Sequence, residues 1–303
     1  ARVALELAKA LSDHPSVALQ TTAWGSLRAR KYFWDHRGVF EGLHPTVQAA
    51  GPFVKALLQQ EKAHPFAAVR LSARRLLQFV NRAQRPVPRE SLAAAQIIHA
   101  SYGRFPNQVR RRRVPKLVTM HDITPLRLPR NSVSAEQLAI TQRIVRGLRA
   151  CDWVACVSEF TRRDLLAFTG RGDDRTVTIP NGVDRQKFRP KNAQEAENSL
   201  AKFGLHGKRF VLTLSSLAPH KNLTLLIQCW ADVLKAVPDA ILVIAGGRQA
   251  KPSDLAAAFG VEDFPSIIFT GHVTDSEFCD LASQCQAFLF PSLYEGFGLP
   301  ALE

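Results

Sequence analysis

The stretch from Phe288 to Glu303 reads FLFPSLYEGFGLPALE. Its first three residues, Phe288–Phe290, form an apolar run typical of a buried strand, and a turn follows. We expect a helix to begin near Gly298, because Pro300 suits a first helical turn, where a missing N–H group is no loss. Such a helix start leaves N–H groups unpaired from about Phe297 to Ala301 and attracts phosphate. The stretch therefore predicts a strand, a tight turn and a phosphate site.

Two carboxylates flank this predicted phosphate site, at Glu295 and Glu303. A carboxylate repels phosphate but accepts hydrogen bonds from paired hydroxyls, which sugar and ribose rings supply. Gly296 and Gly298 let the backbone approach a ligand closely. These residues predict a nucleotide-sugar site, with the diphosphate on the helix start and the hydroxyls on the two glutamates. A glycine-containing loop with solvated glutamates is the alternative interpretation.

Outside this stretch, short β-rich runs alternate with helical segments along the whole chain. Several of the runs are apolar throughout, as expected for strands that are buried on both faces of a parallel sheet. Repeated β-α units predict an α/β fold with two Rossmann-like parallel-sheet domains. The expected strands are Val17–Thr22, Gln96–Ser101, Lys116–His121, Trp153–Val157, Thr176–Pro180, Phe210–Ser215, Ala240–Ala245, Ser266–Thr270 and Ala287–Phe290.

The domain division follows from a polar segment near the middle of the chain. Residues 189–208 follow the turn signal Pro180-Asn181-Gly182 and contain a short helical stretch, so we expect them to be an interdomain linker. Residues 1–188 would then form the N-terminal, acceptor-side domain, and residues 209–303 an incomplete C-terminal nucleotide-sugar domain. The chain begins and ends inside expected helices, so we interpret it as truncated at both ends, with an N-terminal strand and C-terminal helices missing.

The charge of the chain is uneven. Residues 1–113 hold 19 Lys and Arg against 6 Asp and Glu, whereas the remainder hold 21 against 20, within a formal net charge of +14. A basic first part favours an anionic partner. An arginine-flanked apolar helix face at residues 69–80 and the aromatic-basic stretch Arg28–Arg37 favour contact with an anionic membrane, although a solvated surface helix is the alternative. No apolar run approaches the roughly 20 residues that span a bilayer.

The cysteines give no sign of a metal site. The chain has five, none in a CxxC pair and none with histidines at metal-ligand spacing. We expect them to be small buried residues of a protein in a reducing compartment.

Taken together, the motifs resemble the family 4 (group 1) retaining glycosyltransferases of GT-B fold. Glu295 and Glu303 enclose seven residues that include GFGLP, as in the donor-site signature of that family. Five further segments are similar to family motifs in order and spacing: VTMHDITPLRLP (118–129), VSEFTRRDL (157–165), VTIPNGVD (177–184), LSSLAPHKNLTLLI (214–227) and IIFTGHVTDSEF (267–278).

The resemblance implies a role for each matching residue. Glu295 would bind the hydroxyls of the donor sugar, Glu303 the ribose diol and Lys221 the diphosphate. His121 would lie across the cleft near the reacting anomeric carbon, so the expected catalytic residues are His121, Lys221 and Glu295. The remaining donor-binding residues would be Gly296, Phe297, Gly298 and Leu299 through main-chain groups, with His272 and Val273 near the base.

The resemblance also implies a reaction and its partners. A mannose- or rhamnose-like hexose would move from a nucleotide-diphosphate sugar such as GDP-mannose to a lipid-linked or polysaccharide acceptor, with retention of configuration. Absence of an Asp-x-Asp motif agrees with catalysis without a metal or other cofactor. Such an enzyme would act on the inner face of the bacterial cytoplasmic membrane. One departure concerns charge: the family pattern places Arg in most members either just before Lys221 or five positions before it, where this chain has His220 and Ser216.

Two other functions remain open. The chain could be a non-catalytic or inactive sugar-nucleotide-binding fragment, as the expected missing ends and His220 suggest. The pI of about 10.1 and the run Arg110–Arg113 are also compatible with a nucleic-acid-binding module. The basic part shows no helix-turn-helix, zinc-finger or aromatic RNA-binding signature, so we expect no nucleic-acid partner.

Overall fold

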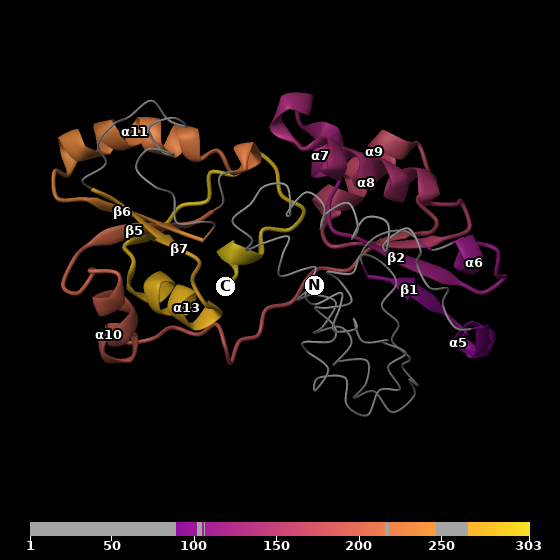
Figure 1. Ribbon diagram of the computed structural model, residues 1–303, viewed down its shortest axis with the longest axis horizontal. Coiled ribbons are helices and arrows are strands. Elements are labelled where there is room, and N and C mark those ends of the chain that lie inside the picture. The colour runs from indigo at the N-terminus through magenta and orange to yellow at the C-terminus, as the bar shows by residue number, and fades with distance from the viewer. Residues whose placement is uncertain (1–88, 102–104, 106, 216–217, 247–265) are drawn as a thin grey trace, which may run out of the picture. The chain divides into compact units, whose positions relative to one another are not determined.

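The structure is a computed structural model that describes residues 89–101, 105, 107–215, 218–246 and 266–303. Figure 1 shows the arrangement of these residues. Three predictions lie outside the described residues: the strand Val17–Thr22, the membrane-facing residues 28–37 and 69–80, and the position of Ser216.

The first sheet has four strands in the order β1-β2-β3-β4. They are β1 (Ile98–Ala100), β2 (Lys116–Met120), β3 (Trp153–Cys156) and β4 (Thr176–Thr178). The strands β1 and β2 pair in parallel, with Ile98 opposite Lys116. Between β3 and β4, the Val154 amide donates to the Arg175 carbonyl (2.9 Å), and the Ile179 amide donates to the Cys156 carbonyl (2.8 Å). This hydrogen-bond pattern is that of two parallel strands. A core cluster under this sheet contains Leu92, Ile98, Ala100, Phe105, Val109 and Val118.

Six helical segments accompany these strands in the described part of the chain. They are α5 (Arg89–Ala94), α6 (Asn107–Arg110), α7 (Thr124–Arg127), the 3-10 helix η2 (Arg130–Ser132), α8 (Ala135–Gly147) and α9 (Glu159–Thr169). The helix α9 begins where the Ser158 hydroxyl accepts a hydrogen bond from the Thr161 amide (3.0 Å) and ends at Gly170, whose φ is 64°. A side-chain cap and a left-handed glycine are the ordinary boundaries of such a helix.

The second sheet has the order β7-β6-β5-β8, and every neighbouring pair is parallel. Its strands are β5 (Phe210–Leu214), β6 (Ile241–Ala245), β7 (Ile267–Gly271) and β8 (Ala287–Phe288). Its helical segments among the described residues are α10 (Ala193–Lys202), η3 (Pro219–Lys221), α11 (Leu223–Ala236), α13 (Asp275–Gln284) and η4 (Leu299–Ala301).

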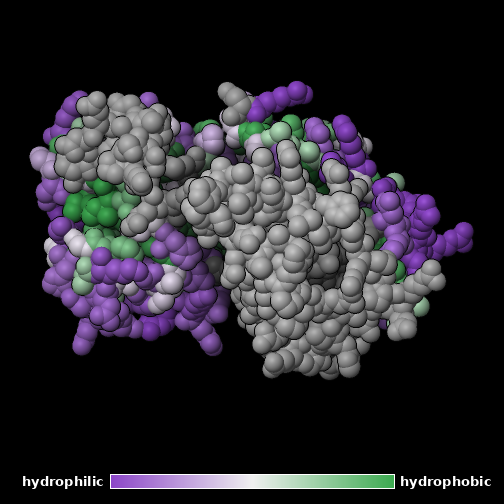
Figure 2. Space-filling model, in the orientation of Figure 1, coloured by the Kyte–Doolittle hydropathy of each residue, from purple (hydrophilic) through white to green (hydrophobic). Residues whose placement is uncertain are grey.

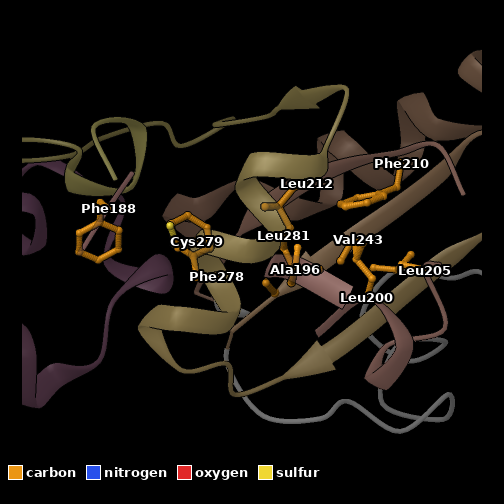
Figure 3. Close-up of a cluster of buried hydrophobic side chains, with 11 residues drawn as sticks. Phe188, Ala196, Leu200, Leu205, Phe210, Leu212, Val243, Phe278, Cys279 and Leu281 are labelled. Atoms are coloured by element: carbon orange, nitrogen blue, oxygen red, sulfur yellow. The ribbon is translucent and has the colours of Figure 1, made fainter. Parts of the chain in front are cut away.

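Both faces of the second sheet are buried. Val243 and Ala245 of β6 pack into the cluster of Figure 3, together with side chains from α10 and α13. The alternate residues Leu242 and Ile244 pack against Trp230 and its neighbours on α11. Because successive side chains of a strand point to opposite faces, burial on both sides requires an apolar residue at every position. This requirement explains the uninterrupted apolar run that the sequence shows at β6.

The fold prediction is confirmed: the chain forms two α/β parts with parallel four-stranded sheets. Each of the eight strands expected within the described residues is present; seven are trimmed at one or both ends, and β7 begins and ends one residue later than expected. The helix expected near Gly298 is present in the described residues as a short 3-10 helix, η4, which Gly298 precedes with a φ of 86°.

The segment predicted to be a linker is fixed to the second sheet's helices. The Asp280 carboxylate on α13 is 6% exposed and accepts hydrogen bonds from the Lys191 ammonium and from the Ser199 hydroxyl of α10, the latter at 2.5 Å. Lys202 at the end of α10 pairs with Glu277 (2.5 Å). Residues 189–208 therefore contain a packed helix, and the division at 1–188, 189–208 and 209–303 stays a prediction.

By compactness the chain forms two units that do not follow the sheets strictly. The first contains the described residues up to Met120 with Arg146–Ala155 and Asp174–Thr176. The second contains His121–Val145, Cys156–Asp173 and Val177–Glu303. All the residues of the candidate site described below belong to the second unit.

The expectation that all five cysteines are buried is wrong for two of them. Cys151 and Cys229 are exposed, whereas Cys156 and Cys279 are buried and Cys285 is intermediate. Burial raises the pKa of the Cys156 thiol to about 12, so this thiol stays protonated and unreactive. Cys151 lies in the turn before β3, and Cys229 lies on α11, where its side chain faces solvent.

The described surface is largely hydrophilic in the view of Figure 2. Within the ranges given above, no helix combines the length and the apolar character that crossing a membrane requires.

Candidate functional site

An ion pair joins the two side chains that the sequence assigns to the diphosphate and the sugar. The Lys221 ammonium lies 2.5 Å from a carboxylate oxygen of Glu295, and the side chains are 21% and 25% exposed. Lys221 ends η3, which follows β5, and Glu295 lies in the loop after β8. Because β5 and β8 are parallel neighbours, the loops at their carboxyl ends meet at one edge of the sheet, the usual ligand position in this architecture.

Two hydrogen bonds connect the η3 turn to the loop that carries Glu295. The Leu293 amide donates to the His220 carbonyl (2.8 Å), and the Asn222 side chain donates to the Pro291 carbonyl (3.2 Å). Asn222 has a φ of 55°, a left-handed conformation that asparagine adopts more readily than most residues. These bonds hold the turn that presents Lys221, so its ammonium reaches Glu295 from a fixed backbone.

An aromatic ring completes the surroundings of the ammonium. The centre of the Phe290 ring lies 5.9 Å from the Lys221 nitrogen, a distance at which the ring face attracts a cation. The added Cβ of a larger residue at Gly298 would be 3.4 Å from the same ring, and the φ of Gly298 favours glycine in any case.

The start of η4 presents amide groups as the sequence predicts, but fewer of them. The Ala301 amide donates to the Gly298 carbonyl (3.1 Å), and the Leu302 and Glu303 amides donate to the Leu299 carbonyl. A 3-10 turn closes its first hydrogen bond one residue earlier than an α-helix, which removes Ala301 from the predicted set. Among the described residues, no partner is recorded for the amides of Phe297, Gly298 and Leu299.

Gly296 has a role that the sequence does not reveal. A Cβ atom at this position would lie 1.8 Å from the His121 carbonyl oxygen, so no larger residue fits. The Gly296 carbonyl accepts hydrogen bonds from the hydroxyls of Thr161 (3.0 Å) and Ser158 at the start of α9. The backbone of His121 therefore requires a glycine here independently of any ligand, and the close approach of Gly296 to a ligand stays a prediction.

The remaining predicted residues are distributed more widely. His121 follows β2 and its carbonyl faces Gly296, while Glu303 is half-buried at the end of η4. His272 is exposed beyond β7, two strands away from β5, and Val273 packs against the core. The structure records no contact of His272 or Val273 with Lys221 or Glu295, and the roles of all these residues toward a ligand stay predictions.

His220 does not supply the positive charge that the resemblance implies for an arginine at this position. Burial and the positive charge of Lys221 lower the pKa of the His220 imidazole, against the opposite influence of Glu295 and Asp122. A histidine with a lowered pKa is neutral at pH 7. The ammonium of Lys221 is therefore the positive charge next to Glu295 in the described part of the site.

Comparisons with known proteins match the sequence of the chain to a family. The family described as Glycosyltransferase Family 4 matches residues 1–187, and the family described as Glycosyl transferases group 1 matches residues 195–303. The chain belongs to glycosyltransferase family 4.

Curated relatives of this family 4 chain are much longer than the matched part. A serotype-specific mannosyltransferase, WbdA, of Escherichia coli is 29% identical over 50% of this chain and 19% of its own length. An alpha-monoglucosyldiacylglycerol synthase of Streptococcus pneumoniae is 32% identical over 54% of this chain and 38% of its own length. The chain thus spans less than two fifths of either relative.

Solved structures share the GT-B fold of the family 4 chain. WaaG, described as a glycosyltransferase of lipopolysaccharide biosynthesis, aligns with a TM-score of 0.56 at 12% identity, over 99% of this chain and 73% of its own. HepE of Anabaena, solved with UDP and glucose, gives 0.53 at 16% identity, over 98% of this chain and 72% of its own. Identities this low establish the fold alone.

A network around the largely buried Asp164 carboxylate, beside Glu295, was missed by sequence reasoning. The Tyr294 hydroxyl donates to the Asp164 carboxylate of α9, which is 9% exposed and also accepts from Arg127 of α7 (2.5 Å). The Phe160 ring packs edge-on against Tyr294, with centres 5.1 Å apart. Burial, and then the bond to Asp164, raise the pKa of Tyr294, so its hydroxyl remains a donor. Asp164 and Arg127 lie in motifs that resemble the family, but nothing in their spacing indicates that they meet Tyr294.

The side chains of the described residues do not indicate a bound metal ion. Among the described residues, no three of the types His, Cys, Asp and Glu are grouped so that they could hold a metal ion. Catalysis without a metal stays a prediction.

Proposed function

We propose that this chain is the catalytic part of a retaining hexosyltransferase, which transfers a sugar from a nucleotide diphosphate to an acceptor hydroxyl. The observation that carries the proposal is the meeting of Lys221, Glu295 and the start of η4 at one edge of a parallel sheet. A cation and unpaired amides suit a diphosphate, and a carboxylate suits sugar hydroxyls.

The main chemical task is to stabilise the departing diphosphate. Lys221 supplies one positive charge, and the amides of Phe297, Gly298 and Leu299 supply donors held by the backbone. Preorganised donors of this kind contribute about 3–4 kcal/mol each in other enzymes. A leaving-phosphate oxygen then takes the proton of the attacking acceptor hydroxyl, so no metal and no further side-chain base are needed.

The donor we propose first is GDP-mannose, followed by other mannose- or rhamnose-like nucleotide sugars. Support comes from WbdA and from an O-antigen chain mannosyltransferase of Escherichia coli, which is 24% identical over 62% of this chain. The UDP bound to HepE makes uridine nucleotides the second choice.

A lipid-linked or polysaccharide acceptor at the cytoplasmic membrane is the partner we propose. The surplus of Lys and Arg in residues 1–113 supports contact with anionic lipid head groups on the inner face of that membrane. The relatives named for O-antigen and diacylglycerol products support the same class of acceptor.

Nucleoside-diphosphate release tests the proposal. The chain is incubated with GDP-mannose, UDP-glucose and dTDP-rhamnose in the presence of bacterial lipid and polysaccharide extracts, and the configuration of the product is determined by NMR. We expect release from at least one donor with retention, and Glu295→Ala should abolish it without changing the circular dichroism spectrum. Release from no donor, or full activity of Glu295→Ala, contradicts the proposal.

A non-catalytic sugar-nucleotide-binding protein is the second candidate. The neutral His220 favours it, because a single ammonium stabilises a leaving diphosphate less than two cations do. Binding of a donor in calorimetry, without turnover under the conditions above, would support this candidate.

A further inference from the structure

We propose that Glu295 discriminates between the nucleotide sugar and the bare nucleoside diphosphate, because it competes with the diphosphate for the Lys221 ammonium. This inference rests on the proposed function and assigns the same carboxylate a second effect on binding. Glu295 would thus bind the donor sugar and also weaken the binding of the nucleoside diphosphate product.

The observation is the direct ion pair within the site. The ammonium and carboxylate are 2.5 Å apart, and the two side chains are only 21% and 25% exposed to solvent. Shielding strengthens the attraction between two charges relative to an exposed pair. Phe290 flanks the same ammonium, and the adjacent imidazole of His220 is neutral at pH 7, so it offers the carboxylate no second cation.

A diphosphate and Glu295 are therefore rival anions for one cation. When phosphate oxygens take hydrogen bonds from Lys221, the carboxylate loses part of its pairing while it remains largely buried. An underpaired, partly buried carboxylate is costly. A donor sugar offsets this cost, because its hydroxyls donate hydrogen bonds to the carboxylate.

The bare nucleoside diphosphate has no sugar hydroxyls at this position. Its binding also separates Lys221 from Glu295, but no sugar hydroxyl then donates hydrogen bonds to the carboxylate. The nucleoside diphosphate is therefore bound more weakly relative to the donor. Removal of the negative charge at residue 295 should consequently strengthen binding of the product and weaken binding of the donor. A residue that merely binds sugar would leave the affinity for the product unchanged.

The test is calorimetry with four probes: UDP, GDP, UDP-glucose and GDP-mannose. Glu295→Gln keeps the size of the side chain and removes its charge. We expect it to bind the preferred nucleoside diphosphate about fivefold more tightly than the wild type, the effect of freeing one partly shielded ion pair. The affinity for the corresponding nucleotide sugar should fall.

Two further variants make the result specific. Asp232→Asn removes the same charge from an exposed pair with Lys235 on α11, where the side chains are 75% and 77% exposed, and it should leave both affinities unchanged. Glu295→Ala should tighten binding of the nucleoside diphosphate in the same direction as Glu295→Gln. Thermal unfolding verifies that each variant is folded.

The outcomes separate this inference from the proposed function. If a nucleoside diphosphate binds the wild type and Glu295→Gln equally well, or binds the folded variant less well, the competition is refuted while the donor site stands. If none of the four probes binds the wild type or the variants, both the donor site and the competition are refuted.

Discussion

Individual charges decide what the candidate site can bind. The Lys221 ammonium pairs with Glu295, whereas the imidazole of His220 has a lowered pKa and is neutral at pH 7. The sequence predicts one phosphate-binding charge fewer than in relatives, and the burial of His220 gives a physical reason why the imidazole does not restore it.

A substitution that adds a positive charge at position 220 tests whether this missing charge limits the affinity for a diphosphate. His220→Arg places a permanent positive charge next to Lys221, so we expect the affinity for UDP or GDP to rise about fivefold. Calorimetry at pH 7.5 measures the change. His206→Arg is the matched control, since His206 is 67% exposed beside Glu197 on another part of the second unit. An equal effect of both variants would show that only the overall charge matters.

Helices and loops, rather than single residues, hold the Glu295 segment in place. Tyr294 is bonded to Asp164 of α9, and the Gly296 carbonyl accepts from two hydroxyls at the start of the same helix. The residues on both sides of Glu295 are thus fixed by one helix, Tyr294 by its middle and Gly296 by its start. In an exposed network, water would compete for these hydrogen bonds. Here the Asp164 side chain is only 9% exposed, so such competition is reduced.

Loss of the Tyr294 hydroxyl should loosen this segment. Tyr294→Phe removes one hydrogen bond to a charged group, which typically contributes about 1.5–3 kcal/mol. Because Arg127 still pairs with Asp164, we expect a decrease in unfolding free energy at the lower end of that range. Urea denaturation measures it. A parallel fall in donor affinity would show that the loop positions Glu295, and unchanged stability would show that the bond contributes nothing.

The contact between α10 and α13 should contribute measurably to the stability of the fold. Asp280→Ala leaves the Lys191 ammonium, which is 15% exposed, without its carboxylate, so we expect a loss of about 3 kcal/mol of unfolding free energy. Asp232→Ala, in the exposed pair with Lys235, should cost less than about 0.5 kcal/mol. If the two variants lose similar stability, the α10–α13 contact does not fix this segment.

Across the whole molecule, carboxylates bonded to cations should set the stability in acid. Hydrogen bonds from Lys202 and from the Thr274 amide lower the pKa of Glu277 from 4.5 to about 2. A lowered folded-state pKa stabilises the fold fully above pH 4.5, and this contribution is lost as the pH falls from 4.5 to 2. Lys202 is 56% exposed, so solvent screening reduces the contribution to about 1–2 kcal/mol.

Glu277→Gln isolates this effect, because glutamine can also form the capping hydrogen bond at the start of α13. Thermal unfolding midpoints are compared between pH 7 and pH 2. We expect the wild type to be more stable at pH 7 and the difference to disappear toward pH 2. A difference that is the same at every pH would mean that the charge of Glu277 has no part in it.

The sequence predicts those parts of the molecule that local patterns determine. The strand β6 is apolar throughout because both faces are buried, and the turns after β5 and β8 carry the motifs that contain Lys221 and Glu295. Contacts between distant residues could not be predicted. The closeness of Gly296 to His121, and of Tyr294 to Asp164, depends on how loops pack, and no spacing in the sequence records it.

The most direct measurement is a crystal structure of the chain with the nucleotide sugar that binds most tightly among UDP-glucose and GDP-mannose. The account predicts the diphosphate within hydrogen-bond distance of Lys221 and of the Gly298 and Leu299 amides, and a sugar hydroxyl donating to Glu295. A diphosphate bound elsewhere, or a Glu295 carboxylate without contact to the sugar, would contradict it.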